Sequence, residues 1–321
     1  MIKLKKERHI WFDKMLTLST LAIMAFFYYG SHFAVMAVLS VLTAFAAELV
    51  SVRLMHEKPD PDDLSCTADG LLIALMMPAS LNYVIAFLAA LFGIVAAKNV
   101  FGGRKNMVFS PAAAAYLFVL TSWGRDMLTY PSPHDYVSLS GKTGVLVNSA
   151  SHVFNMTGKM DYTDFEILMG NFSGPSGSVS ILLILLAALI LMLRKDISAG
   201  AFFGTIAGTA LFAFTAPMIH DRSDSVKYSL VTNMVLFAAV YIVSDLRIAP
   251  RRWYFAFFYG LFIGIFAYVL VLTRAKENAI VIMSVLFTPA ALGMRMLEKK
   301  IEHADDEAEK AEAAEKEAAE A

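Results

Sequence analysis

The stretch Trp253–Leu272, WYFAFFYGLFIGIFAYVLVL, decides the fold of this chain. It contains 20 residues and no charge, which is the length that an α-helix needs to cross about 30 Å of hydrocarbon. Similar apolar runs recur along the 321-residue chain, which is 58% hydrophobic and 17% charged. Continuous runs of this kind lack the alternation of barrel strands, and only helices or closed barrels satisfy their backbone in lipid. The sequence therefore predicts an all-α polytopic membrane protein.

We expect about ten transmembrane helices, near 15–30, 33–52, 70–80, 82–98, 107–123, 178–193, 199–217, 229–244, 253–272 and 279–296. Prolines mark three of them. The short third helix holds Pro78, the fifth is interrupted early by Pro111, and the tenth is interrupted by Pro289. Broken helices are tolerated in a membrane where neighbouring protein or a cavity satisfies the freed backbone groups.

The basic residues predict the orientation of these helices. An even number of crossings leaves both termini on one side, together with 20 of the 27 Lys and Arg residues. The other side receives seven, namely Arg125, Lys142, Lys159, Arg222, Lys227, Arg274 and Lys276. Because basic loops stay inside, we expect cytoplasmic termini in a cell inner or plasma membrane and an external segment over residues 124–177.

Five regions follow from this topology. We expect a retained cytoplasmic N-terminus (1–14), a first five-helix repeat (15–123), the external 124–177 segment, a second five-helix repeat (178–297) and an acidic cytoplasmic tail (298–321). The net charge of −1 favours no nucleic-acid partner. The single cysteine, Cys66, excludes a self-contained thiolate metal cage. No P-loop or Rossmann glycine pattern is present, so the chain carries no complete active site of those classes.

A short motif indicates an internal repeat. Phe109–Ala112 reads FSPA, and Phe287–Ala290 reads FTPA, 178 residues later. Two halves of five helices each have inverted topologies, as in urea- and ammonium-type channels, and such repeats place binding sites near the membrane midplane. The alternative is that the motif recurs by chance in an apolar, Ala-rich chain.

Several longer patterns point to a family. They are Asp69–Pro78 (DGLLIALMMP), Lys98–Ala112 (KNVFGGRKNMVFSPA), Gly170–Ser180 (GNFSGPSGSVS) and Ser244-Asp245 with Pro250. Together they resemble the RnfD/NqrB family, the flavin-carrying membrane subunits of Rnf and sodium-pumping NADH:quinone reductase complexes. The resemblance implies an electron-transport subunit of a translocase. It would move electrons via flavin between ferredoxin and NAD⁺, coupled to Na⁺ or H⁺ translocation, beside other membrane and iron–sulfur subunits.

The resemblance also implies a flavin site. Where the family carries D-x-x-[ST]-[GS]-A-[TS], with FMN esterified to the last hydroxyl, this chain reads VLVNSAS over Val145–Ser151. Ser151 takes the attachment position and Ser149 the position two residues before it. Val145 and Asn148 replace the acid and the first hydroxyl residue. The alternative is that this stretch is a polar turn.

Two glycines that follow are further cofactor-binding candidates. Gly174 and Gly177 allow close approach of backbone to a ring or phosphate, and the N-terminus of the next helix attracts phosphate. The alternative is a flexible linker that enters a membrane helix.

Two acids are candidates for an ion path. Asp69 lies at the edge of an apolar helix, and Glu48 lies within one, where ionisable groups are costly and often functional. As the family implies, Asp69 would alternatively bind a second, non-covalent flavin such as riboflavin. The alternative without an ion path is that Asp69 is a carboxylate at a helix N-terminus and that Glu48 is an interfacial acid near Arg53.

Two rival functions of the chain stay open. One is a urea- or ammonium-type solute channel or transporter, and the other is a cofactor-free scaffold subunit.

Overall fold

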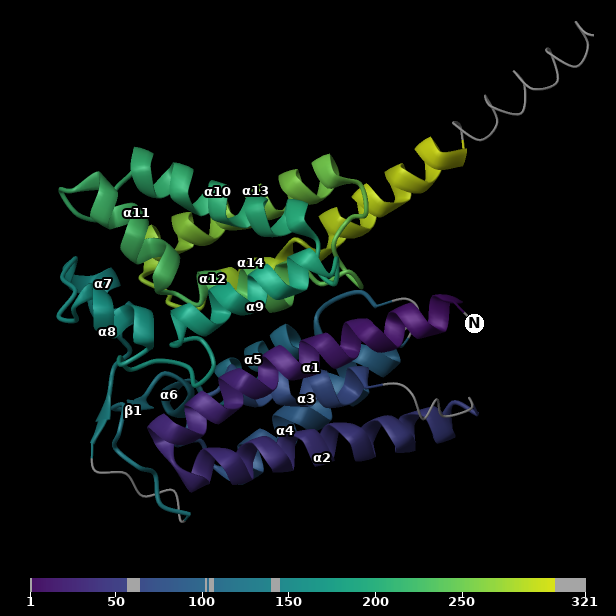
Figure 1. The fold of residues 1–321 in the computed structure, drawn as a ribbon, viewed down its shortest axis with the longest axis horizontal. Helices are drawn as coiled ribbons and strands as arrows, with labels where there is room; N and C mark the ends of the chain where they lie inside the picture. Colours follow the sequence, from purple (N-terminus) through teal and green to yellow (C-terminus); the bar gives the residue numbers. More distant parts are fainter. Residues whose placement is uncertain (1, 57–63, 102, 104–106, 140–144, 304–321) are drawn as a thin grey trace, which may run out of the picture.

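The computed structural model describes residues 2–56, 64–101, 103, 107–139 and 145–303 and is largely helical (Figure 1). The first half contains α1 (Ile2–Tyr29), α2 (Ser31–Leu54), α3 (Ser65–Leu75), α4 (Tyr83–Phe92), its π-helical continuation η1 (Gly93–Val100), and α5 (Pro111–Ser122). The second half contains α9 (Ile181–Leu193), α10 (Ala199–Thr215), α11 (Arg222–Val231), α12 (Val235–Ala238), its π-helical continuation η3 (Ala239–Val243), α13 (Trp253–Arg274) and α14 (Ala279–Leu286).

The 124–177 segment joins the two halves. It contains α6 (Gly124–Met127), β1 (Tyr130–Pro131), β2 (Leu146–Val147), α7 (Ala150–Thr157) and α8 (Asp164–Met169). The two short strands pair antiparallel, with Tyr130 opposite Val147. Figure 1 shows this segment at one end of the molecule and the start of α1 at the other.

Four helices are long and apolar enough to cross a membrane, at His9–Tyr29, Ser31–Leu54, Tyr83–Val100 and Trp253–Arg274. Two bent pairs raise the number to six if each is one crossing: α11 with Val235–Val243, bent by 54°, and α14 with Thr288–His303, bent by 45°. Four more apolar helices, α3, α5, α9 and α10, are shorter. The described residues therefore form a multi-pass helical membrane protein with four to six candidate spans, and the ten crossings stay a prediction.

Helix breaks follow the prolines only in part. Pro111 does not interrupt a helix but starts α5, with Ser110 as its N-cap, because proline at the first position loses no hydrogen bond. The bend after α14 falls at Phe287, two residues before Pro289. The bend after α11 has no proline. There Asn233 and Met234 both adopt left-handed backbone, with φ of 55° and 58°.

The predicted outer boundaries of the two repeats fall within helices. Helix α1 begins at Ile2 rather than after residue 14, and the last described helix runs to His303. Glu298, expected in the solvated tail, is buried and accepts hydrogen bonds from the backbone N–H groups of Arg251 and Arg252, at 3.0 and 2.7 Å. Residues 304–321 lie outside the described residues.

Helices α10 and α13 pack closely through glycines, and Figure 1 shows them side by side. Gly200, Gly204 and Gly208 follow one another at four-residue spacing on α10, and Gly260 and Gly264 do so on α13. A Cβ at Gly204 would overlap the carbonyl oxygen of Phe257. Small residues at this spacing let membrane helices approach to backbone contact, so this seam requires glycine.

Candidate functional site

The predicted flavin-attachment stretch forms the start of α7. Ser149 is its N-cap, and its Oγ accepts a hydrogen bond of 2.9 Å from the backbone N–H of His152. The N–H of Ala150 donates to the carbonyl of Ser173 at 2.9 Å. The sequence N-S-A-S therefore folds as a helix start rather than a turn, because serine caps a helix well.

Ser149 also contacts a buried carboxylate. Its hydroxyl donates to Glu277, whose other oxygen accepts a hydrogen bond of 2.9 Å from the hydroxyl of Tyr130. Glu277 lies in the loop between α13 and α14 and is 7% exposed. Burial raises the pKa of Glu277 to about 7, although the hydrogen bond from Tyr130 and the charge of Lys276 act in the opposite direction. This group titrates near neutrality.

Ser151 faces the bend between α11 and α12. Its Oγ accepts a hydrogen bond of 2.9 Å from the backbone N–H of Asn233, a residue that the bend takes out of the helical hydrogen-bond ladder. The side-chain amides of Asn155 and Asn233 pair at 2.6 and 3.3 Å. Helix α7 therefore supplies hydrogen-bond partners to the backbone and the side chain of Asn233, which the bend would otherwise leave unpaired.

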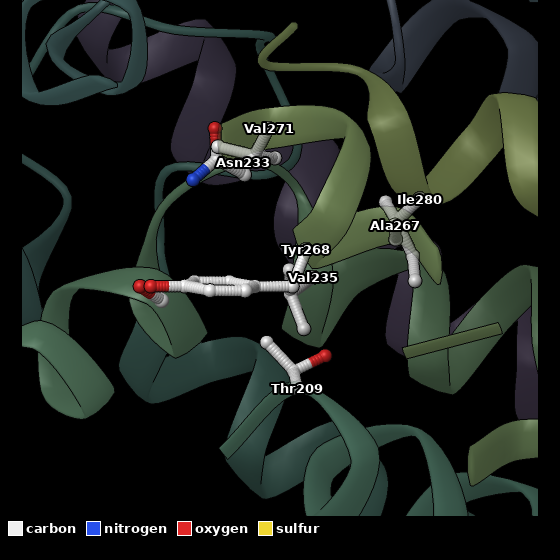
Figure 2. Close-up of a pocket in the computed structure, with 8 residues that line it drawn as sticks. Thr209, Asn233, Val235, Ala267, Tyr268, Val271 and Ile280 are labelled. Carbon is white, nitrogen blue, oxygen red and sulfur yellow. The ribbon is translucent and has the colours of Figure 1, made fainter. Parts of the chain in front are cut away.

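Ser151 as placed does not fit a flavin ester. The side chain is 7% exposed, and its oxygen already accepts from Asn233. A cavity beside Asn233, lined also by Thr209, Val235 and Tyr268 (Figure 2), has room for no more than about one water molecule. An isoalloxazine ring would need α7 to separate from the bend.

Gly177 lies against α3 instead of an open phosphate cradle, and Gly174 packs against Val179 and Phe172. The N–H of Gly177 donates to the carbonyl of Leu75 at 2.7 Å, and the N–H of Ser176 donates to that of Met77 at 3.1 Å. A Cβ at Gly177 would lie 2.6 Å from the Cβ of Leu75. The close backbone approach expected of these glycines is present at Gly177, but its partner is the C-terminal end of α3.

A network of buried ion pairs lies at the opposite end of the molecule. Both oxygens of Asp69 accept from the guanidinium of Arg247, at 2.7 and 2.8 Å, and Arg247 also pairs with Asp245 at 2.7 Å. Lys14 approaches Asp245 to 3.3 Å. Burial would raise the pKa of Asp245, but the charges of Arg247 and Lys14 outweigh it and hold that pKa well below its usual value. The charge of the Asp69 carboxylate is thus compensated by the guanidinium of Arg247.

Glu48 belongs to a second buried pair. Its two oxygens accept from Lys98 Nζ and Asn99 Nδ2, each at 3.0 Å. Lys98 is fully buried and also donates to Ser65, one turn before Asp69 on α3. The partner of Glu48 is therefore Lys98 and not Arg53. An ion path through Glu48 or Asp69, or a second flavin at Asp69, stays a prediction, and either role would have to displace these cations.

The sequence interpretation did not identify Glu277, Asn233 or the roles of Lys98 and Arg247. A signal existed for Glu277, because an acid in a short loop between two apolar helices has little room to reach water. Arg247 and Lys98 are 178 and 50 residues from their partners, and one sequence does not pair such distant charges.

Comparison with known proteins places this architecture in context. Residues 4–294 match the model of the NQR2, RnfD, RnfE family. The D subunit of the ion-translocating oxidoreductase complex of Shewanella amazonensis is 24% identical over 284 residues, which cover 78% of this chain and 80% of that protein. The D subunit of the Na⁺-translocating ferredoxin:NAD⁺ oxidoreductase complex of Acetobacterium woodii is 26% identical over 214 residues, which cover 65% of this chain and 63% of that protein. The corresponding protein of the ion-translocating oxidoreductase complex of Methanosarcina acetivorans is 24% identical over 79% of this chain and 77% of its own length.

Proposed function

The chain belongs to the NQR2, RnfD, RnfE family, and we propose that it is the RnfD-type membrane component of an ion-translocating oxidoreductase complex. The observation that carries the proposal is the family match over residues 4–294, joined to relatives named as D subunits of such complexes. In this role the complex transfers electrons between ferredoxin and NAD⁺ and moves Na⁺ or H⁺. Other membrane and iron–sulfur subunits supply the redox centres that a chain with one cysteine lacks.

The test removes the protein from its complex. Deleting the gene in the cells that produce it should abolish ferredoxin-dependent NAD⁺ reduction in membrane vesicles. A tagged copy should restore the activity and co-purify with iron–sulfur and flavin-containing membrane proteins. Full activity in deletion membranes would refute the proposal. Solute flux through the purified chain alone in liposomes, together with that activity, would favour the solute-channel alternative.

We also propose ten crossings in two inverted halves, with both termini cytoplasmic. Support comes from the ten apolar helices or bent pairs, from helix starts or bends at both FSPA-type motifs, and from the asymmetry of basic residues. The test uses single cysteines at the exposed Tyr136 and Leu54 in a Cys66→Ala background. A membrane-impermeant maleimide should label position 136 in intact cells, and position 54 only after lysis. The reverse labelling would overturn the orientation.

For Ser151 we propose a structural role, which favours a protein without flavin at this position. Burial of the hydroxyl and its bond to Asn233 support this role. The neighbouring Ser149 is likewise engaged, because its hydroxyl bonds the buried carboxyl of Glu277. Covalent FMN on Ser151 stays a prediction, and no electron-transfer step is assigned to it.

In-gel flavin fluorescence of denatured protein, after co-expression with a flavin transferase, separates the two roles. We expect no band for the wild type, because Ser151 is buried, and no band for the variant Val145→Asp/Asn148→Ser, which restores the two replaced motif positions but leaves the packing of Ser151 unchanged. A wild-type band that disappears in Ser151→Ala would establish the ester and refute the purely structural role.

A further inference from the structure

Glu277 is a buried carboxyl with no cation in ion-pair contact among the described residues. Among the described residues, its bonded partners are the hydroxyls of Tyr130 and Ser149, both from the 124–177 segment. The adjacent Lys276 is exposed and lies outside ion-pair distance. Two hydroxyl donors offset only part of the free energy needed to bury a charge, because an uncompensated buried carboxylate favours its neutral form.

Further polar atoms around this carboxyl lack partners. The hydroxyl of Tyr116, on α5, and the Oδ1 of Asn278 are buried close to each other, and neither makes a hydrogen bond of full geometry within the part of the chain that the structure describes. Tyr116 lies within electrostatic reach of Glu277, and Tyr29, at the end of α1, lies near Tyr130. Buried polar groups without partners are rare. Their gathering around one acid indicates a polar site in which the hydrogen-bond pattern can change.

We propose that Glu277 is a proton-binding site and that its hydrogen bonds attach the 124–177 segment to the membrane helices. The protonated carboxyl both donates and accepts, so it bonds Ser149 and Tyr130 without burying a charge. The carboxylate accepts from both hydroxyls, but burial penalises its charge more than these bonds and the Lys276 charge offset, and opening of the segment would hydrate it. Protonation therefore strengthens the attachment of the segment, and deprotonation weakens it. This inference does not depend on the proposed electron-transport function.

The direction with pH follows from linkage. The pKa of Glu277 is about 7 in the folded chain against 4.5 for the ordinary group, so the folded state binds more protons between these values. The stabilisation is complete below about pH 4.5 and is lost as the pH rises through about 7. Each pKa unit between the states corresponds to about a tenfold change in the equilibrium constant.

Infrared difference spectra of the purified full-length protein test the protonation itself. Between pH 5.5 and 8.5 we expect a carboxylic C=O band whose midpoint lies near neutral pH and which is absent from Glu277→Gln. Asp196→Asn is the matched control, because Asp196 also has a pKa raised by burial, to about 6. That variant should keep the Glu277 band. A difference band unchanged in Glu277→Gln, or the absence from this pH range of any band that depends on Glu277, would overturn the proposal.

Hydrogen exchange of the 124–177 segment tests the attachment. After correction for intrinsic rates, the wild-type segment should open about tenfold or more readily at pH 8.5 than at pH 5.5. Glu277→Gln, which mimics the neutral acid, should open no more readily at pH 8.5 than the wild type does at pH 5.5. The same pH dependence of segment opening in the wild type and in Glu277→Gln would refute the role of Glu277 in attaching the segment. Exchanging K⁺ for Na⁺ at constant pH should leave the midpoint unchanged, and a Na⁺-dependent shift would identify a metal-cation site instead.

Discussion

The two ends of the molecule bury carboxylates in opposite ways. Where α1 begins, Asp69 and Asp245 share the guanidinium of Arg247, and Glu48 pairs with Lys98. At the other end, Glu277 receives only hydroxyl donors among the described residues. A neighbouring cation compensates the charge of a buried carboxylate, whereas burial without such a contact raises the pKa of the acid, as it does for Glu277. The difference indicates that ion pairs hold the first end together, whereas the attachment proposed at the second end depends on the protonation of Glu277.

One acid at the first end departs from this pattern. Asp196, in the loop between α9 and α10, is buried against Asp13. Asp13 itself pairs with Arg194 at 2.9 Å. Burial and the neighbouring carboxyl raise the pKa of Asp196 to about 6. The compensation of a buried acid therefore depends on whether a cation directly contacts it, and not on which end of the molecule the acid occupies.

Removing the shared cation should have the largest effect. Arg247→Met leaves Asp69 and Asp245 buried, with Lys14 as the remaining ion-pair partner of Asp245 among the described residues, and losing one partner of a buried pair costs about 3–5 kcal/mol. We expect little folded protein in detergent, measured by size-exclusion chromatography and thermal unfolding. A stable, monodisperse Arg247→Met protein would show that this end is not held by its ion pairs.

The Lys98–Glu48 pair allows a test in which the charge that the first substitution leaves unpaired is removed by a second one. Lys98→Met should cost about 3 kcal/mol because it leaves the Glu48 charge without its cation. Adding Glu48→Gln removes that charge and should recover part of the loss in thermal unfolding. If the double variant is no more stable than Lys98→Met alone, the penalty comes from packing and not from charge.

At the opposite end, loss of a neutral contact should cost less. Ser151→Ala leaves the backbone N–H of Asn233 without its acceptor, an expected loss of about 1–3 kcal/mol in the free energy of unfolding. Thr121→Ala is the matched control, since its exposed hydroxyl bonds only within its own helix. Equal stability of the two variants would contradict the role assigned to Ser151.

The smallest effect is expected from an exposed pair at the same end. Lys227 bonds Asp164 at 2.9 Å, but both side chains are largely in solvent. Lys227→Met should change the free energy of unfolding by less than about 1 kcal/mol, and salt should reduce the difference further. A loss comparable to that of Arg247→Met would mean that burial does not decide the strength of these pairs.

Much of the fold could be predicted from the sequence. Runs such as Trp253–Leu272 locate helices because length and apolarity are local properties, and α13 runs from Trp253 to Arg274. The bend at Asn233 was missed because no proline marks it and its stability depends on Ser151, 82 residues away. The site was less predictable for the same reason. A motif can mark Ser151 as a candidate, but only the packed structure reveals that its hydroxyl faces inward.

The glycine seam between α10 and α13 has a mechanical consequence. Because carbonyl oxygens of each helix occupy the space that a Cβ would take on the other, sliding by one residue would drive side chains into backbone. The two helices therefore keep a fixed register and can move only as one rigid body. Any alternating motion in the second half must take place at its bends, at Asn233 and Phe287, and not along this seam.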